Sequence, residues 1–472
     1  MILKGGLIYM KIIKAISLIA AAAALVLMLP GCAGTGHGET VGAPVDPTDE
    51  SRETSEAFAV TDSNNILKEG NTYTVVSSGR YTFSGKLEDG NIVVNAGEDD
   101  KVELILNGIT VSSSESAPVS VISADKVTVN AANGSYNVLR DLRSEDGSDE
   151  NAALFADCDL EIEGNGTLIV ESQAYGGIKT KDDLTVSEAA VKVTSAGDAV
   201  RGNDSVALES GSLILISNGA DGIATANSGI SSGGKQKGGV TISEALTDVN
   251  AASDGIDAEY DIDISGGALK IVCGDDGLHA EGSVTISGGD IEISESHEAI
   301  EANVITISGG NTVVSGNDDG INATRGAVSP MIDISGGYLE VSAPDGDTDA
   351  IDSNGDINVS GGTVLIKSRT DENSLSGSVD ADGALTVSGG TVIALGKIAD
   401  APSDGSTGIY LSDGRTIGAG GYSIVGEDGK TVINFAVDGD YSLGWICSDK
   451  LQSGENYKLI SGEVTAAEWT QQ

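Results

Sequence analysis

The sequence predicts an all-β fold, a parallel β-helix that is closed by a small antiparallel cap at its C-terminal end. From about residue 61 onward the chain consists of short runs in which apolar and polar residues alternate, and no segment keeps a helical period over three turns. Glycine contributes 65 residues and aromatic residues only 4%, which favours many tight turns over one large globular core. An internal repeat of about 22 residues is the strongest signal.

The first 31 residues have the layout of a secretory signal. Lys11 and Lys14 precede an apolar run at 16–29, which is too short for a comfortable membrane span. A Leu-Pro-Gly-Cys motif follows and resembles the end of a bacterial lipoprotein signal, so we expect Cys32 to carry the lipid. This predicts an extracellular protein that is lipid-anchored to the outer face of the bacterial cytoplasmic membrane. An ordinary cleaved signal is the alternative, and Met10 is an alternative start.

The remaining chain divides into three predicted segments. Residues 32–58 are rich in Gly, Thr, Pro and acidic side chains without apolar periodicity, which predicts a flexible tether. Residues 59–396 carry the repeats of the predicted β-helix. Residues 397–472 contain hairpin-like turns and most of the late aromatic residues, and we expect them to cover the open end of the solenoid.

Two repeated units define the predicted coils. A tetrapeptide of Ile or Val, Ser and two glycines recurs at intervals of 21 to 28 residues, and a unit of the type Asp-Gly-Ile-Asp-Ala-Glu stands between its copies. Strand alternation places Ile256 and Ala258 inside the coil and Asp257 and Glu259 outside. The glycine pairs allow a tight corner with positive φ. The tetrapeptides start at residues 264, 286, 307, 334, 359 and 387.

Composition excludes several classes of function. The chain has 72 Asp and Glu against 26 Lys and Arg, a net charge of −46, so nucleic acid is a poor partner. The cysteines that follow Cys32 are few and far apart, which does not indicate a disulfide framework. The three histidines are scattered along the sequence, and no Cys/His cluster indicates zinc. We expect a monomer.

Stacked repeats would align the acidic residues in columns. Like charges one coil apart, about 4.8 Å, repel by roughly 0.9 kcal/mol even in bulk water. Calcium takes oxygen ligands at about 2.3–2.6 Å, so two ligands on opposite sides of the ion lie nearly one coil apart. We therefore expect Ca²⁺ between the coils; the alternative is turn-forming Asp on a solvated face. The predicted ligands are Asp254, Asp257, Glu259, Asp275, Asp276, Glu281, Glu298 and Glu301.

Five segments of the chain carry a specific resemblance, namely 102–108, 137–141, 151–155, 160–168 and 177–184. They resemble a family of bacterial surface proteins described as carbohydrate-binding domain proteins. The resemblance implies a polysaccharide-lyase-like right-handed parallel β-helix over about residues 60–465. It also implies binding of plant cell-wall polysaccharide, cellulose and polygalacturonate, with calcium held by the helix and no established lyase activity. It gives no residue-level sugar site.

The residues themselves favour an acidic ligand. Calcium would bridge the acidic coils to the carboxylates of a pectin-like polyuronate. Neutral cellulose would need a row of aromatic platforms, and Tyr175, Tyr260 and Tyr338 do not share one register.

Two other classes of function stay open. A calcium-dependent pectate lyase would need a basic residue to remove a proton beside the metal, and Lys179, Lys181 and Arg201 lie on the outward face of the coils that precede the acidic ones. Charge compensation is the more common role of such residues, so a non-catalytic binding module is favoured. A structural adhesin or spacer is the third class.

Overall fold

The computed structural model describes residues 50–472, except 62, 145, 146, 148, 344–347, 370–376, 404 and 405. The predicted signal segment and Cys32 lie outside the described residues. No helix in the described ranges is long and apolar enough to cross a membrane. The helical residues described there are two single 3₁₀ turns, η1 (Glu50–Arg52) and η2 (Ser63–Asn65).

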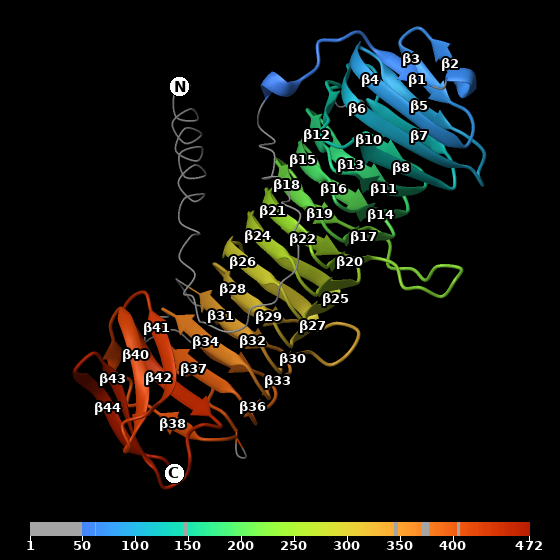
Figure 1. The fold of residues 1–472 in the computed structure, drawn as a ribbon. Coiled ribbons are helices and arrows are strands. Elements are labelled where there is room, and N and C mark those ends of the chain that lie inside the picture. Colours follow the sequence, from blue (N-terminus) through green and yellow to red (C-terminus); the bar gives the residue numbers. More distant parts are fainter. Residues whose placement is uncertain are drawn as a thin grey trace, which may run out of the picture. The chain divides into compact units, whose positions relative to one another are not determined.

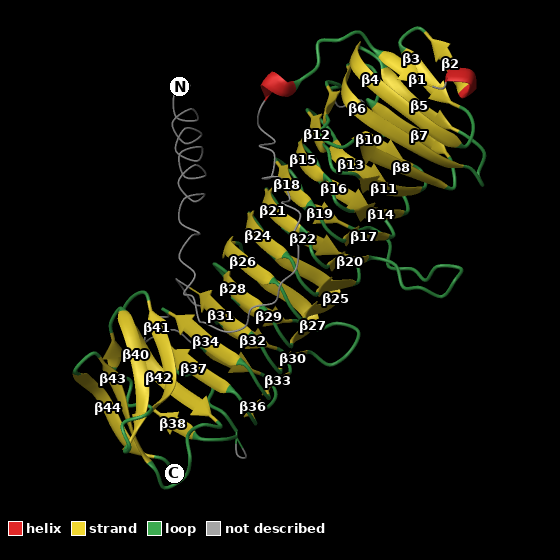
Figure 2. Ribbon diagram, viewed as in Figure 1, coloured by secondary structure: helices red, strands yellow, loops and turns green. Residues whose placement is uncertain are grey.

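The chain winds through three parallel β-sheets, each of which receives one strand or half of a long strand from every coil (Figures 1 and 2). This confirms the predicted parallel β-helix. The first sheet contains β3 (Thr72–Val75), β5 (Asn91–Asn95), β7 (Val119–Ser123), β10 (Ala152–Ala156), β13 (Gly176–Thr180), β16 (Val200–Gly202), β19 (Ile223–Ala224), β22 (Ile256–Ala258), the first halves of β25 (Leu278–Ile286) and β27 (Ile300–Ile307), β29 (Ile321–Ala323), β32 (Ile351–Ser353) and β35 (Val379–Ala381).

The second sheet contains the first parts of β4 (Gly79–Glu88) and β6 (Lys101–Ser113), then β8 (Lys126–Ala131), β11 (Asp159–Glu163), β14 (Asp183–Val186), β17 (Ser205–Leu208), β20 (Gly239–Ile242), β23 (Asp261–Ile264), the second halves of β25 and β27, β30 (Met331–Ile334), β33 (Asp356–Val359) and β36 (Leu385–Val387). The third sheet contains the ends of β4 and β6, then β9 (Tyr136–Asp141), β12 (Thr167–Ser172), β15 (Ala190–Ser195), β18 (Ser212–Ser217), β21 (Leu246–Ala251), β24 (Ala268–Cys273), β26 (Asp290–Glu295), β28 (Asn311–Ser315), β31 (Tyr338–Ala343), β34 (Thr363–Ser368) and β37 (Thr391–Leu395).

The core fills the inside of the coils with one layer of Ile, Val, Leu and Ala from each sheet. In β22, Ile256 and Ala258 are fully buried, whereas Asp257 between them is partly exposed, as the alternation predicts. Each buried residue lies above its equivalent in the preceding coil, so Ile256 pairs with Leu278 and Leu278 with Ile300. The result is one continuous apolar cluster along the solenoid.

The two glycines of each repeated tetrapeptide are required for different reasons. The second glycine has positive φ in every copy, +75° at Gly267 and +78° at Gly310 for example. The first glycine lacks positive φ, but a Cβ on Gly309 would lie only 2.3 Å from the carbonyl oxygen of Ser287 in the coil below. The predicted positive-φ corner is therefore confirmed for the second glycine, and close stacking of the backbones explains the first.

We expect Gly310→Ala to destabilise the protein more than Gly414→Ala. Both glycines have φ of +78°, so each alanine costs about 1–3 kcal/mol of backbone strain. At Gly310 the Cβ would also lie 2.7 Å from the carbonyl oxygen of Gly289, whereas no atom lies within 4 Å at Gly414. Urea unfolding of both variants measures the difference. Equal loss of unfolding free energy would show that stacking places no demand on Gly310.

The N-terminal coil is covered by antiparallel pairings. β1 (Ala59–Thr61) pairs with β4, and β2 (Ile66–Glu69) pairs with β3. Residues ahead of β1 also contact the solenoid, because Glu53 forms an ion pair with Arg140 and the Arg52 guanidinium lies over the Tyr136 ring. The end of the segment predicted as a flexible tether is thus attached to the first coils.

The C-terminal cap consists of antiparallel strands, as predicted. β42 (Tyr441–Ser448) pairs antiparallel with β37, and its fully buried Trp445 and Cys447 belong to the main core, so β42 covers the last coil. β38 (Ile409–Leu411) and β39 (Thr416–Ile417) pair with β42. A separate four-stranded sheet contains β40 (Gly420–Gly426), β41 (Thr431–Val437), β43 (Asn456–Ser461) and β44 (Val464–Thr470).

Candidate functional site

From β10 onward, one residue in each coil of the first sheet occupies the outward position of its strand, and strand register stacks these residues into a single row, which we call the outward row. The row begins with a hydrophobic residue and two cations, passes through one alanine, and continues with mainly acidic residues. Its order is Phe155, Lys179, Arg201, Ala224, Asp257, His279, Glu301, Asn322, Asp352 and Asp380.

A second line of acids, the turn ladder, runs beside the outward row at the turns that lead into the first sheet. The carboxylates of Asp254 and Asp276 each accept a hydrogen bond from the backbone N–H of the next acid in the ladder, at 2.7 and 3.0 Å. Asp319 does the same for the N–H of Asp349. These acids therefore have a structural role, because they satisfy backbone donors between coils. The ladder consists of Asp198, Asp221, Asp254, Asp276, Glu298, Asp319 and Asp349.

The turn ladder and the outward row come together as two clusters of possible metal ligands. Asp254, Asp257 and His279 have ligand atoms within 4.8 Å of one another, and so do Asp276, Glu298 and Glu301. Asp276 and Glu298 are buried, which removes much of the water that would otherwise solvate their charge. We call the second group the carboxylate cluster.

Burial and like charge disfavour ionisation of these acids. Burial, followed by the charge of Glu301, raises the pKa of Glu298 to about 8, and burial raises the pKa of Asp254 to about 7. Burial also raises the pKa of Asp276, to about 6. The Asp257 carboxylate, 3.3 Å from His279 Nδ1, raises the pKa of that imidazole to about 9. His279 thus supplies a positive charge to the first cluster at neutral pH.

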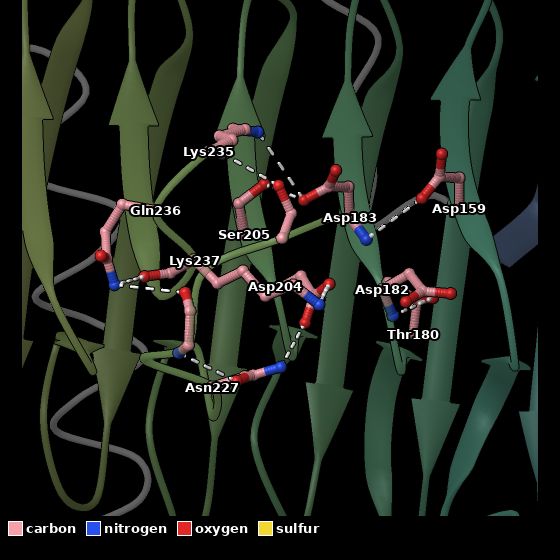
Figure 3. A network of polar contacts seen from close by, with 12 residues as sticks. Asp159, Thr180, Asp182, Asp183, Asp204, Ser205, Asn227, Lys235, Gln236 and Lys237 are labelled. Atoms are coloured by element: carbon pink, nitrogen blue, oxygen red, sulfur yellow. Dashed lines mark hydrogen bonds and ion pairs between the residues drawn. The ribbon is translucent and has the colours of Figure 1, made fainter. Parts of the chain in front are cut away.

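A third acidic group shows how the chain neutralises acids with its own side chains (Figure 3). It lies at the turns between the first and second sheets, where the loop between β19 and β20 reaches back over the preceding coils. Lys237 of this loop forms an ion pair with Asp204, Asn227 donates to Asp204 at 2.7 Å, and Lys235 lies 3.9 Å from Asp183. Lys235 and Lys237 thus partly neutralise the negative charge of Asp183 and Asp204.

The carboxylate cluster has no such cover. Within the described part of the chain, no Lys or Arg forms an ion pair with Asp276, Glu298 or Glu301. The nearest neutral partner is Asn322, whose amide nitrogen donates to both oxygens of Glu298 at 3.1 and 3.2 Å. The Asn322 Oδ1 atom is buried and has no hydrogen-bond partner. The three acids therefore face one another without a lysine or arginine among the described residues, and the imidazoles of His279 and His297 are the positively charged or chargeable groups that lie beside them.

The structure brings together six of the eight predicted calcium ligands. Asp275 lies with Asp276 and His297 in a further group, whereas Glu259 and Glu281 belong to none of the groups. The stacked column that contains Glu259 and Glu281 does not continue as acids, because Asn303 takes the next place, is buried and bonds the backbone at Thr324 and Val328. The register shifts here, since β25 has one more residue than β27 between its paired segments.

His279, His297 and Asn322 were not among the predicted calcium ligands, although His279 and Asn322 share the repeat position of Asp257 and Glu301. The histidines are distant in sequence, but His279 lies one coil from Asp257, and His297 Nδ1 lies 3.9 Å from Asp276. Their places in the repeat, aligned with Asp257 and next to Glu298, were the signal that could have found them.

The three basic residues proposed for a lyase do not act as one group. Lys181 forms an ion pair with Asp157 at 3.0 Å. Lys179 and Arg201 line one cavity with Tyr175. Arg201 is two coils from Asp257, a distance of about 10 Å at the usual strand spacing.

Comparison with known proteins gives one family. A family model described as carbohydrate-binding domain-containing protein matches residues 69–320 and 275–429, more than half of the chain. A curated relative with that description, from Acetivibrio thermocellus, is 37% identical over 118 residues, which are 24% of this chain and 41% of the relative. The match thus spans less than half of that relative's length.

A solved structure was also found. It is described as the polysaccharide lyase-like protein from C. thermocellum, as a gadolinium derivative. It has 27% sequence identity and a TM-score of 0.41, over 52% of this chain and 90% of the solved one.

Proposed function

Because the chain belongs to the family of carbohydrate-binding domain-containing proteins, we propose that it binds an acidic, pectin-like polysaccharide along its first sheet with the help of Ca²⁺. Membership of the family supports carbohydrate binding in general. The choice of an acidic polymer, the calcium and the place of binding are proposed from the chemistry of the outward row.

The carboxylate cluster is the observation that carries the calcium proposal. Asp276, Glu298 and Glu301 offer only oxygen ligands, and their ligand atoms lie within 4.8 Å of one another. Carboxylate and amide oxygens are the donors that Ca²⁺ takes. Calcium bound there would neutralise the cluster and offer its remaining positions to the carboxylate oxygens of a uronic acid.

The row favours an acidic ligand over a flat neutral glucan. A neutral glucan binds well on a row of aromatic faces, but the row has one aromatic residue, Phe155, which is buried. Tyr175 is buried as well, and Tyr338 donates its hydroxyl to Glu340. Cellulose is therefore the less favoured ligand, although the proposal does not depend on excluding it.

The place of action is also proposed. The lipoprotein-like signal supports an extracellular protein that is anchored through Cys32 to the outer face of the membrane. A polymer-binding module in that position would hold polysaccharide close to the cell while separate enzymes act on it.

Calorimetry of the purified protein with polygalacturonate, in calcium and in EDTA, tests the proposal. We expect binding in calcium, loss of binding in EDTA, and no unsaturated product at near-ultraviolet wavelengths. Product formation would indicate a lyase instead of a binding module. Absence of binding in both buffers would contradict the proposed function.

A further inference from the structure

A cavity beside the two cations of the outward row, Lys179 and Arg201, has no part in the calcium proposal. It has a volume of about 210 Å³ and lies between the coils of β13 and β16. Drug-sized pockets are typically about 300–1,000 Å³, so this one has room for part of a polymer, about one sugar unit. Its polar lining residues are Asn151, Tyr175, Lys179, Asp198 and Arg201.

Lys179 is the unusual group in this cavity. Its side chain is partly buried, and its ammonium donates to Asn151 Oδ1 at 3.0 Å. Among the described residues it has no ion pair, although the chain carries 72 acids against 26 bases. Burial and the charge of Arg201 lower the pKa of Lys179, against the attraction of Asp198, which lines the same cavity. Because the lining has two cations and one carboxylate, its net charge is positive and favours an anion.

Arg201 adds a second donor on the same side. Its Nη1 atom pairs with Asp198 at 2.8 Å, and its Nε atom reaches Asn203 at 3.4 Å. These contacts hold the guanidinium in place, while Nη2 has no hydrogen-bond partner within the described residues. Lys179 and Arg201 are also neighbours in the outward row, one coil apart. Two fixed N–H donors of this kind suit a carboxylate.

The walls of the cavity are closely packed. Gly176 and Gly197 both line it, and their coils stack so tightly that a Cβ on Gly197 would lie 3.1 Å from the backbone nitrogen of Gly176. The buried ring of Tyr175 forms part of the wall, and the Arg143 guanidinium packs 4.6 Å from the ring centroid. The cavity is thus built of rigid parts.

We propose that this cavity is a subsite for a sugar carboxylate, in which Lys179 and Arg201 bind the free acid of one uronic-acid unit directly, without calcium. The inference rests on the proposed function and extends it. Ala224 separates this cationic subsite from Asp257, where the acidic part of the row begins. A polyuronate that lies along the row would therefore meet the protein's own cations first and the calcium-binding coils afterwards.

Binding of trigalacturonate and of its methyl ester, both in calcium, tests the subsite. We expect Lys179→Gln to weaken binding of the free acid about 10-fold, the usual value of one charge-assisted hydrogen bond. The methyl ester lacks the carboxylates that both Lys179 and calcium would bind, so it should bind neither protein appreciably. The melting temperature in calcium should equal that of the unmodified protein, because Lys179 holds no structural ion pair among the described residues.

Lys270→Gln is the matched control. Lys270 is an exposed lysine of β24 in the third sheet, and it pairs with Glu292 at 3.0 Å. Loss of affinity for the acid in Lys179→Gln alone would support the subsite. Unchanged affinity, or equal loss in both variants, would overturn the subsite and leave the proposed function standing. Failure of the unmodified protein to bind polygalacturonate in any buffer would overturn the proposed function itself.

Discussion

Glu301→Gln is expected to raise the melting temperature in EDTA and to remove most of the stabilisation that calcium provides. Without metal, the Glu301 charge acts against Asp276 and Glu298, as the raised pKa values of both show, so its removal relieves repulsion. With calcium at 100 times its Kd, the unmodified protein should gain about 2.7 kcal/mol, and the variant much less. Relative to the unmodified protein, Glu301→Gln should thus raise the melting temperature in EDTA and lower it in calcium.

Thermal unfolding in EDTA and in calcium measures both effects. Glu292→Gln is the matched control, because Glu292 lies on the third sheet, is 54% exposed and pairs with a lysine. It should change neither melting temperature appreciably. A calcium-induced shift that Glu301→Gln leaves intact would place the ion elsewhere and contradict the assignment to the carboxylate cluster.

The pH dependence in EDTA follows from the same acids. The pKa values of Asp254, Asp276 and Glu298 are about 6 to 8 in the folded protein, above the value of about 4 in the unfolded chain. Between these limits the folded state binds more protons, so stability should fall as pH rises from about 4 to 8. Glu301→Gln should flatten this fall, and calcium should oppose it. Stability that rises through this window would contradict the prediction.

Arg143→Met is expected to cost about 3–5 kcal/mol of unfolding free energy, more than loss of the exposed ion pairs among the described residues. Arg143 and Asp141 form a two-point ion pair with side chains only 3% and 0% exposed. Removal of the guanidinium leaves the Asp141 carboxylate buried and without its cation, which costs far more than loss of a surface pair.

Urea unfolding checks this value against Arg80→Met. Arg80 pairs with Glu103 but is 70% exposed, and its removal should cost at most about 1 kcal/mol. The double variant Asp141→Asn, Arg143→Met should recover part of the loss, because no buried charge remains. A loss below about 1 kcal/mol in Arg143→Met would show that the buried pair contributes no more than a surface pair.

The sequence allowed the coils to be predicted because their physical requirements repeat. Alternation at Ile256, Asp257 and Ala258 assigned the inside and outside of β22, and the paired glycines assigned the corners. Both patterns can be read within a few residues, and each recurs in coil after coil, so the repeated copies support one another. The register that aligns Asp257 with His279 and Glu301 then follows from the repeat itself.

The rest depended on details that do not repeat. The loop that follows β29 buries Asn303 through bonds to the backbone of Thr324 and Val328, so the residue that follows the repeated Ala at this coil is not available as an outward ligand. The Asp of the repeated Asp-Gly pair also accepts a hydrogen bond from the backbone of the next coil, as Asp254 does from the N–H of Asp276. Composition alone cannot distinguish an Asp in this structural role from an Asp that binds a metal. The pairing of Lys181 with Asp157, apart from Lys179, depends on side-chain geometry that no spacing reveals.

The outward row receives one side chain from each coil, and each coil contacts mainly its two neighbours. A gene duplication or deletion of one repeat would therefore lengthen or shorten the row by a single position while the remaining coils keep their fold. Ligand preference in this architecture can therefore evolve in discrete steps, because each gained or lost coil adds or removes one ligand-facing side chain. The present row, with its lysine, its alanine and its acids, is one product of such steps.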